Sequence, residues 1–541
     1  MSDHNKNNTS ELPATKTQST PPAEAPVLLE LRNIGKRFGE TIANEGIDLT
    51  LRKGEVVALL GENGAGKTTL MSILFGHYVA DQGSIHTADA NGVLQPLPPG
   101  NPQAALAARI GMVHQHFTLA ENLSGFENIL LGSEKLWLPA RGRAALRARV
   151  EAQMAESGLH VSLDERVSNL TVGERQRIEI LKALAHNTQV LVLDEPTAVL
   201  TPQEAEGLYK TVALLASRGL AVIFISHKLH EVLAASHRIV VLRRGRLVGE
   251  LTTANASKDQ IAEMMVGHEV PRTERGEATV GEPVLQLLDV SLESSQQRQR
   301  LQHVTLTVCR GEVVGVAGVS GNGQAGLADL ISGLALPSSG KLLIDGEEVQ
   351  RTGPRHLMAR GVARIPEDRH HQGVVASMNI RENLMIESLD DARFQRFGVI
   401  KAAASRSHAI EQIDAYDVRC EGPDAVVGQL SGGNMQKLIL ARALDQEPLL
   451  ILASQPARGL DIGAQTDVYR RLLEARKRGA GVVLISEDLD ELFTLSDRIV
   501  VLHDGELTEA GASDEIDRRE VGLLMAGQGS NHQQSTQESA L

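Results

Sequence analysis

The chain has 541 residues, too many for one ordinary hydrophobic core, so we expect two or more domains. Its formal net charge of −14 argues against a general binder of nucleic acid or of anionic membranes. No apolar run approaches the ~20 residues that cross a bilayer, and no secretory-signal layout opens the chain, so we expect it in the cytosol. Cys309 and Cys420 are too few for a disulfide framework or a zinc site, which predicts reduced thiols.

Both ends of the chain are poor in large apolar side chains. Residues 1–26 are rich in Asn, Ser, Thr, Gln and Pro, and residues 527–541 have a similar composition. Nothing in either segment can offset the entropy lost on ordering. We therefore expect two disordered tails.

A glycine-rich loop follows the first buried strand. Residues 55–60 are predicted to form that strand and residues 70–75 an apolar helix, the order that the pattern G-x-x-x-x-G-K-[ST] requires. The pattern is formed by Gly61, Glu62, Asn63, Gly64, Ala65, Gly66, Lys67, Thr68 and Thr69. Its backbone N–H groups can hold a polyphosphate, while Lys67 neutralises the β and γ phosphates. Thr68 can bind Mg²⁺, and Thr69 can donate to an α-phosphate oxygen.

Two carboxylates end a later buried strand. Asp194 and Glu195 follow Leu191-Val192-Leu193, at the edge of an open α/β sheet where ligands bind. Asp194 can hold the Mg²⁺ shell, and Glu195 can polarise the water that attacks the γ-phosphate. The alternative is an ordinary strand-end turn with solvated acids.

The sequence repeats itself at a long interval. Gly61 corresponds to Gly318 (318 − 61 = 257), and Leu170 corresponds to Leu430 (430 − 170 = 260). A unit of this length predicts two homologous domains, residues 27–268 and 284–526, joined by a polar linker at residues 269–283.

Apolar runs alternate with helical patterns in both halves. Continuous runs such as residues 190–193 and 482–485 suit parallel strands covered on both faces. Leu146, Val150 and Met154 fall at helical spacing, and so do Ile410 and Ile413. We therefore predict an α/β fold in which each half has a mixed or parallel sheet and an inserted helical subdomain.

With Gln115 and His227, the order of motifs resembles the nucleotide-binding domains of ABC transporters. The tandem form with an LSGGN segment is similar to the ATP-binding subunits of importers for simple sugars and nucleosides. The resemblance implies ATP and Mg²⁺ as cofactors, with Gln115 touching the Mg²⁺ site and the membrane partner. It also implies that His227 contacts the γ-phosphate and that Phe38 stacks on adenine, although Phe38 could instead be a core aromatic.

The second half keeps the sequence pattern of the fold but lacks the residues expected to bind phosphate and Mg²⁺ and to activate water. Gln324 replaces the lysine, Ala325 the threonine, Ser454 and Gln455 the two carboxylates, and Glu487 the histidine. A glutamine cannot act as a general base at neutral pH.

In the family that the chain resembles, a second motif called the signature precedes the acidic strand. Here it lies at residues 170–174 and 430–434, and it is degraded in the half whose phosphate loop is intact. The first reads Leu-Thr-Val-Gly-Glu at residues 170–174, whereas the second keeps Ser431, Gly432 and Gly433. Asp461 stands where the first half has Thr201. The related domains close head to tail, so the resemblance implies that the competent parts of the two halves meet in one ATP site, formed by the halves of one chain or of two chains in an equivalent arrangement.

These features predict the ATP-hydrolysing subunit of an ABC import system for a small hydrophilic solute, a nucleoside in preference to a simple sugar. The resemblance implies membrane permease subunits and an extracytoplasmic solute-binding protein as partners, and no nucleic acid. It places the chain peripherally on the cytoplasmic face of the inner membrane. A soluble tandem protein acting on the ribosome, or a DNA-repair ATPase, would need a charged helical linker or coiled coils that the sequence lacks.

Overall fold

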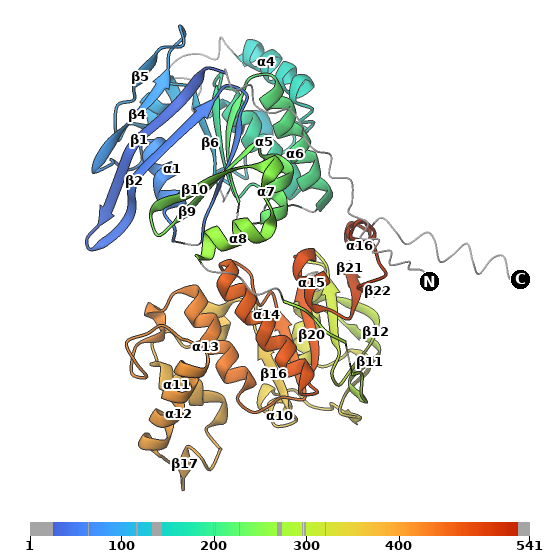
Figure 1. Cartoon of the computed structure of the whole chain (residues 1–541). Coiled ribbons are helices and arrows are strands. Elements are labelled where there is room, and N and C mark those ends of the chain that lie inside the picture. Colours follow the sequence, from blue (N-terminus) through green and yellow to red (C-terminus); the bar gives the residue numbers. More distant parts are fainter. Residues whose placement is uncertain are drawn as a thin grey trace, which may run out of the picture. The chain divides into compact units, whose positions relative to one another are not determined.

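The computed structural model describes residues 25–62, 64–114, 117–131, 143–197, 200, 202–226, 228–267, 273–277, 279–294, 296, 299–319 and 321–527. The chain divides into two compact units, Met1–Val270 and Pro271–Leu541 (Figure 1). Residues 1–24 and 528–541 of the predicted tails lie outside the described residues. Ala25, the first described residue, is buried, and its carbonyl accepts a hydrogen bond from Arg52 Nη1 at 2.9 Å.

Unit 1 begins with strands and alternates strands with helices after the glycine-rich loop. Its strands are β1 (Val27–Phe38), β2 (Thr41–Arg52), β3 (Val56–Leu60), β4 (Gln82–Ala88), β5 (Leu94–Pro96), β6 (Ile110–Val113), β7 (Val190–Asp194), β8 (Ala221–Ile225), β9 (Arg238–Arg243) and β10 (Arg246–Thr252). Its helices are α1 (Lys67–Leu74), α2 (Pro102–Ala107), α3 (Gly125–Leu130), α4 (Arg143–Ser157), α5 (Val172–Leu184), α6 (Pro202–Ser217), α7 (Leu229–Ala235) and α8 (Lys258–Val266).

Unit 2 repeats this order. Its strands are β11 (Pro283–Leu292), β12 (Leu301–Cys309), β13 (Val313–Ala317), β14 (Ser339–Ile344), β15 (Glu347–Glu348), β16 (Val362–Ile365), β17 (Gln395–Arg396), β18 (Val399–Ile400), β19 (Leu450–Ser454), β20 (Gly481–Ser486), β21 (Arg498–His503) and β22 (Glu506–Ala512). Its helices are α9 (Gln324–Ile331), α10 (Pro354–Met358), α11 (Ile380–Met385), α12 (Ala402–Ala415), α13 (Gly432–Leu444), α14 (Ile462–Lys477), α15 (Leu489–Leu495) and α16 (Arg518–Met525).

The two larger sheets of each unit have the same topology, and unit 2 has in addition a two-stranded antiparallel sheet of β17 and β18. Within the described residues, unit 1 has an antiparallel sheet of order β2-β1-β4-β5 and a mixed sheet of order β10-β9-β3-β8-β7-β6. Unit 2 has the matching orders β12-β11-β14-β15 and β22-β21-β13-β20-β19-β16. Strands β6, β7, β8, β3 and β9 are parallel, and only β10 runs antiparallel to its neighbour. The predicted α/β fold in two homologous halves is confirmed.

Each mixed sheet is covered on both faces. In unit 1 the antiparallel sheet lies on one side and α4, α5 and α6 on the other (Figure 1). Every residue of β3, β7 and β8 is buried as a result, which explains why these strands are continuous apolar runs. The strand ends that carry polar residues are therefore set in a rigid core.

The predicted helical insertions are present. Leu146 and Val150 on α4 are buried, and Ile413 on α12 packs against the core of unit 2. Ile410 also lies on α12, although 44% of its surface is exposed. The buried positions of this 14-residue helix are the small residues Ser405 and Ala409.

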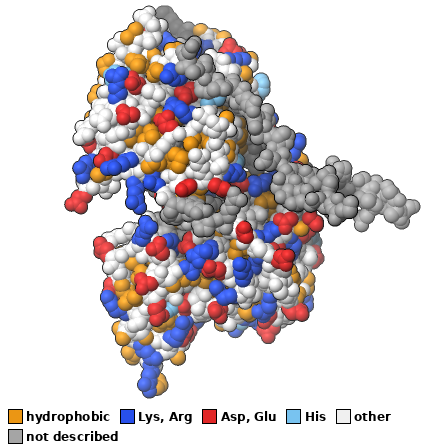
Figure 2. Space-filling view, in the orientation of Figure 1, with side chains coloured by type: hydrophobic (Ala, Val, Ile, Leu, Met, Phe, Trp, Pro, Cys, Tyr) orange, Lys and Arg blue, Asp and Glu red, His pale blue; other side chains and the backbone are white. Residues whose placement is uncertain are grey.

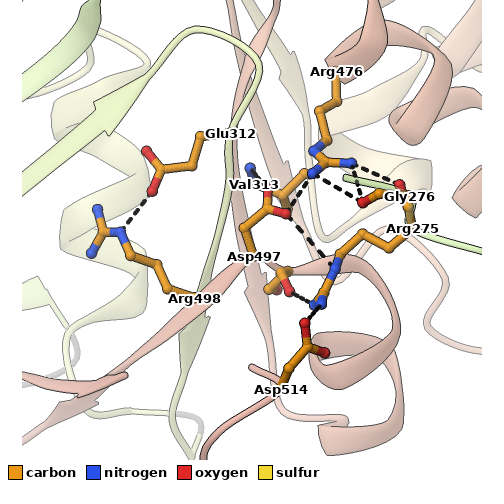
Figure 3. A network of polar contacts seen from close by, with 9 residues as sticks. Arg275, Gly276, Glu312, Val313, Arg476, Asp497, Arg498 and Asp514 are labelled. Atoms are coloured by element: carbon orange, nitrogen blue, oxygen red, sulfur yellow. Dashed lines mark hydrogen bonds and ion pairs between the residues drawn. The ribbon is translucent and has the colours of Figure 1, made fainter. Parts of the chain in front are cut away.

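A network of arginines and carboxylates holds residues 275 and 276 against unit 2 (Figure 3). The buried Arg476 donates from Nη1 to the Arg275 carbonyl at 2.7 Å and from Nη2 to Asp497 Oδ1 at 2.5 Å. The second oxygen of Asp497 accepts the backbone N–H of Val313, at the start of β13, at 2.8 Å. Part of the predicted linker is therefore fastened to the central strand of unit 2.

The described surface is polar and mixed in charge. On the face seen in Figure 2, acidic and basic side chains are interspersed over both units. None of the helices in the described ranges is both long and apolar enough to cross a membrane.

One buried carboxylate makes the stability of unit 2 depend on pH. Burial raises the pKa of Glu491 to about 8 from an ordinary 4.5, and the nearby Asp488 raises it further. Between about pH 4.5 and 8 the folded unit keeps a proton that the unfolded chain releases, so unit 2 loses stability as the pH rises through this range.

Glu491→Gln should remove this dependence, because an amide imitates the protonated acid and does not titrate. The free energy of unfolding of the unchanged protein should fall more steeply between pH 5.5 and 7.5 than that of the variant, by up to ~1.4 kcal/mol per pH unit. Denaturant unfolding at both pH values measures the difference. Glu411→Gln, at an exposed carboxylate of α12, is the control, and equal slopes for all three proteins would contradict the assignment.

Candidate functional site

The glycine-rich loop joins β3 to α1 and is shaped by close backbone contacts. A Cβ on Gly61 would lie 2.4 Å from the Leu242 carbonyl oxygen, and one on Gly66 would lie 2.2 Å from the Ala43 carbonyl oxygen. Gly66 has φ of 100° and caps α1 in the left-handed region, and Asn44 Nδ2 donates to its carbonyl at 3.1 Å. Only glycine fits at these two positions. The predicted helix begins at Lys67, three residues before the expected start.

Lys67 lies inside the loop. Its Nζ donates to the Gly61 carbonyl at 2.7 Å and to the Glu62 carbonyl at 3.0 Å, and only 7% of the residue is exposed. Burial lowers the pKa of Lys67, while the charges of Glu195, Asp194 and Glu62 oppose that shift. The ammonium is thus already dehydrated and held by carbonyls that a phosphate can replace.

Asp194 and Glu195 end β7 beside this lysine. Burial, and then the charge of Glu195, raise the pKa of Asp194 to about 6 against the opposing charge of Lys67. Glu195 has φ of 47°, and its N–H donates to the Ile225 carbonyl of β8 at 3.0 Å. The coupled carboxylates Asp194 and Glu195, and Thr68, an exposed residue next to Lys67, carry the hard oxygen ligands that suit Mg²⁺, so the residues fit this ion.

The other predicted residues of the first half differ in position. Gly64 is exposed with open space around it, Ala65 is buried, and Thr69 is half-buried. Phe38, at the end of β1, is 44% exposed and meets Tyr78 edge to face at 5.4 Å between ring centroids, so it is not a core aromatic. The predicted residues Asn63, Gln115, His227 and Thr201 lie outside the described residues.

The matching loop of unit 2 is closed by its own side chain. Gln324 Nε2 donates to the Val319 carbonyl at 2.8 Å, and its Oε1 accepts the N–H of Asn322 at 3.1 Å. Gln455 has φ of 48°, and its backbone N–H donates to the Ile485 carbonyl at 2.8 Å. The turn after β19 therefore matches the turn at Glu195. The backbone of a phosphate site survives in unit 2 without its charges.

The two signature segments differ at their helix N-termini. Thr171 caps α5, and Glu174 Oε2 accepts both its N–H and its hydroxyl at 2.9 Å, which lowers the pKa of Glu174. Ser431 caps α13, but the matching residue is the neutral Asn434, whose Nδ2 donates to Ser431 Oγ at 2.9 Å. A helix N-terminus attracts anions. The one in unit 1 already has a carboxylate of its own, whereas that of α13 has none from its capping residues.

Gly432 and Gly433 begin α13 without steric conflict. A Cβ on Gly433 would make an ordinary contact, 3.5 Å from the Ala464 Cβ. Asp461 caps the next helix, α14, by accepting the N–H of Ala464 at 2.7 Å. The two segments that we expected to face ATP from the second half thus lie side by side.

Arg369 was missed by the sequence argument. Its Nη1 donates to the Gly432 carbonyl at 3.3 Å, and its Nη2 donates to the Arg458 carbonyl in the loop before α14. Arg369 begins a short π-helix, Arg369–Gly373, in the connection between β16 and α11 at residues 366–379, whereas the matching connection of unit 1 spans residues 114–124. The greater length of this connection in unit 2 was the sequence feature that could have drawn attention to Arg369.

Comparison with known proteins gives concordant matches. A family model described as ABC transporter matches residues 44–198 and 301–458. Glucose import ATP-binding protein TsgD13 of Haloferax volcanii is 42% identical over 532 residues, which cover 93% of this chain and 96% of that protein. Nucleoside import ATP-binding protein NupA of Lactococcus lactis is 38% identical over 501 residues, 92% of this chain and 98% of that protein. A solved structure named RNase-L Inhibitor aligns over 92% of each chain with a TM-score of 0.60 and 18% identity, a likeness of fold alone.

The two loops should respond differently to the same substitution. Lys67→Ala removes the buried cation and should lower ATP hydrolysis by at least ~100-fold, because charge stabilisation in such a site is worth that much. Gln324→Ala only breaks bonds within the second loop and should keep most of the activity. Steady-state phosphate release by the purified full-length protein measures both, and equal losses would contradict the division of roles.

Proposed function

The chain belongs to the family of ABC transporter ATP-binding proteins, and from this premise we propose that it couples ATP hydrolysis at one competent site to the import of a small hydrophilic solute. One observation carries the proposal. Unit 1 holds the cation and the two carboxylates, whereas unit 2 holds the helix N-terminus whose capping residues bring no carboxylate. Each unit lacks what the other supplies.

The first unit supplies the groups that act on the phosphates. Lys67 exchanges its loop carbonyls for the β and γ phosphates of ATP. Asp194 and Thr68 hold Mg²⁺ with Gln115, and the ion, when bound, neutralises charge that develops on the phosphate oxygens. Glu195 orients the attacking water and accepts its proton, and His227 contacts the γ-phosphate. Phe38, exposed at the end of β1, stacks on adenine.

The second unit supplies the opposite wall of the site in head-to-tail pairing. Ser431, Gly432 and Gly433 bring the N-terminus of α13 to the γ-phosphate, where its backbone N–H groups and dipole attract the anion. Asp461 approaches from the adjoining end of α14. The reverse combination would set Glu174 against the uncharged Gln324 loop, and it hydrolyses little or nothing.

The transported solute is proposed as a nucleoside. Gln324, where sugar importers tend to carry arginine, favours that branch, and a relative named for nucleoside import is 38% identical. A simple sugar is the second candidate, since a relative named for glucose import is 42% identical. Residues that touch ATP do not select the solute, so both candidates use the same site.

The proposal requires partners. Relatives named as import ATP-binding proteins support separate permease subunits as partners, and through them an extracytoplasmic solute-binding protein. This arrangement places the chain peripherally on the cytoplasmic face of the membrane. A role on the ribosome is the distant alternative, and a role on nucleic acid is not proposed.

The helix N-terminus of α13 can be tested by exchanging one residue between the units. Asn434→Glu introduces the capping carboxylate that unit 1 has, so it should stabilise unit 2 by ~0.5–1 kcal/mol and lower ATPase activity at least ~10-fold. The reciprocal Glu174→Asn should leave the activity nearly unchanged. Denaturant unfolding and phosphate release measure the two effects, and an active Asn434→Glu protein would rule out α13 as part of the site.

Uptake assays in cells and co-purification distinguish the importer from the alternatives. Cells producing Lys67→Ala in place of the unchanged chain should lose uptake of a radiolabelled nucleoside and keep uptake of unrelated solutes. Loss of sugar uptake with intact nucleoside uptake would select the second candidate. A tagged unchanged chain should also co-purify with membrane subunits, and recovery with ribosomes instead would overturn the importer assignment.

A further inference from the structure

A buried carboxylate joins the ends of two strands at the first site. Glu231 on α7 is 2% exposed and accepts two short hydrogen bonds from hydroxyl groups. Thr197 Oγ1 donates to its Oε1 at 2.6 Å, and Ser226 Oγ donates to its Oε2 at 2.6 Å. Lys228 Nζ lies 3.7 Å from Oε1 and supports the negative charge. Hydrogen bonds to a buried charged group are among the stronger ones in proteins.

The two strand ends belong to the catalytic turn. Thr197 lies two residues after Glu195, and Ser226 directly follows Ile225, whose carbonyl accepts the Glu195 N–H at 3.0 Å. Glu195 has φ of 47°, a conformation that a residue with a side chain keeps only when its surroundings impose it. The turn is thus held on one side by the backbone of β8 and on the other by the Thr197 hydroxyl.

Unit 2 keeps half of this arrangement. Ser486 Oγ donates to Glu491 as Ser226 does to Glu231. Ala457 stands where Thr197 stands, and it bonds to Glu491 through its backbone without offering a hydroxyl. Asp488 also replaces Lys228, so an anion faces the carboxylate in place of a cation. The hydroxyl and the cation are present only in the unit that has the two site carboxylates.

The backbone turn does not depend on the hydroxyl. Gln455 in unit 2 has φ of 48° and the same bond to the neighbouring strand, at 2.8 Å to the Ile485 carbonyl. The fold therefore forms with alanine at the position of Thr197. What the hydroxyl adds is a fixed position for the residues that follow Glu195.

We propose that Thr197, through Glu231, is a positioning residue that holds the Glu195 carboxylate in place for the hydrolytic step. Thr197 contacts neither nucleotide nor water in this role, and it acts through the turn. The inference rests on the proposed role of Glu195 as the base. It predicts that the hydroxyl affects turnover and leaves nucleotide binding unchanged, since Lys67 is held by the Gly61 and Glu62 carbonyls of its own loop.

The test compares two substitutions at one position. Thr197→Val keeps the shape and removes the hydroxyl, and it should lower kcat about tenfold or more, since misplacing a catalytic group by a fraction of an ångström has effects of this size. Its KM and its binding stoichiometry for ATP should not change. Thr197→Ser restores the hydroxyl without the methyl group and should restore kcat.

Two further proteins separate the possible explanations. Ser486→Ala removes the matching hydrogen bond in unit 2 and should leave kcat unchanged. If it lowered kcat as much as Thr197→Val does, the loss would reflect lower protein stability and not the position of Glu195. Equal kcat values for the Val and Ser variants, whether high or low, would overturn the positioning role. Glu195→Gln tests the premise separately: if it does not slow hydrolysis, the proposed base is wrong, and if it does while Thr197→Val stays fast, only the positioning role fails.

Discussion

A buried ammonium beside two crowded carboxylates is the constraint on which the first site depends. Burial disfavours the charged forms of both residues, so it lowers the pKa of Lys67 and raises the pKa of Asp194. Such a cluster persists because the cation partly offsets the two carboxylates and because the start of α1 and the end of β7 hold the three residues. The glycine contacts of the loop and the fully buried strands β3 and β7 supply that rigidity. The site is thereby prepared for a ligand that brings phosphate charge and a metal ion together.

The second unit shows what remains when the charges are removed. The strands, the helix after the loop and the left-handed turn at Gln455 are all retained, while Gln324 satisfies the carbonyl that faces it. At the helix N-termini it is unit 1 that departs, since Glu174 adds a carboxylate to the start of α5, whereas Asn434 adds none to the start of α13. Opposite losses in two copies of one fold are what a shared site between unlike halves requires.

Much of this could be read from the sequence because it depends on local order. The phosphate loop, the acidic strand end and the repeat at an offset of 260 residues are patterns of neighbouring residues, and the fold follows from apolar periodicity. The link from Thr197 to Glu231 could not be read, because it joins side chains 34 residues apart whose meeting depends on how β7, β8 and α7 pack. The same holds for Arg369, which reaches Gly432 from 63 residues away. The capping box of α5 was visible as Thr-x-x-Glu, but the comparison of signature segments treated Glu174 only as a departure from a motif. Gln115 and His227 stay predictions.

The central claim is that one of the two phosphate loops is catalytic and that it works against the signature segment of the other unit. The measurement that tests it most directly is the location of nucleotide trapped with vanadate during turnover, using a photoreactive ATP analogue and mapping of the labelled peptides. Labelling confined to residues 61–69 and to the segment around residues 430–434 is the result that this account predicts. Equal labelling of the loop at residues 318–326 would contradict it.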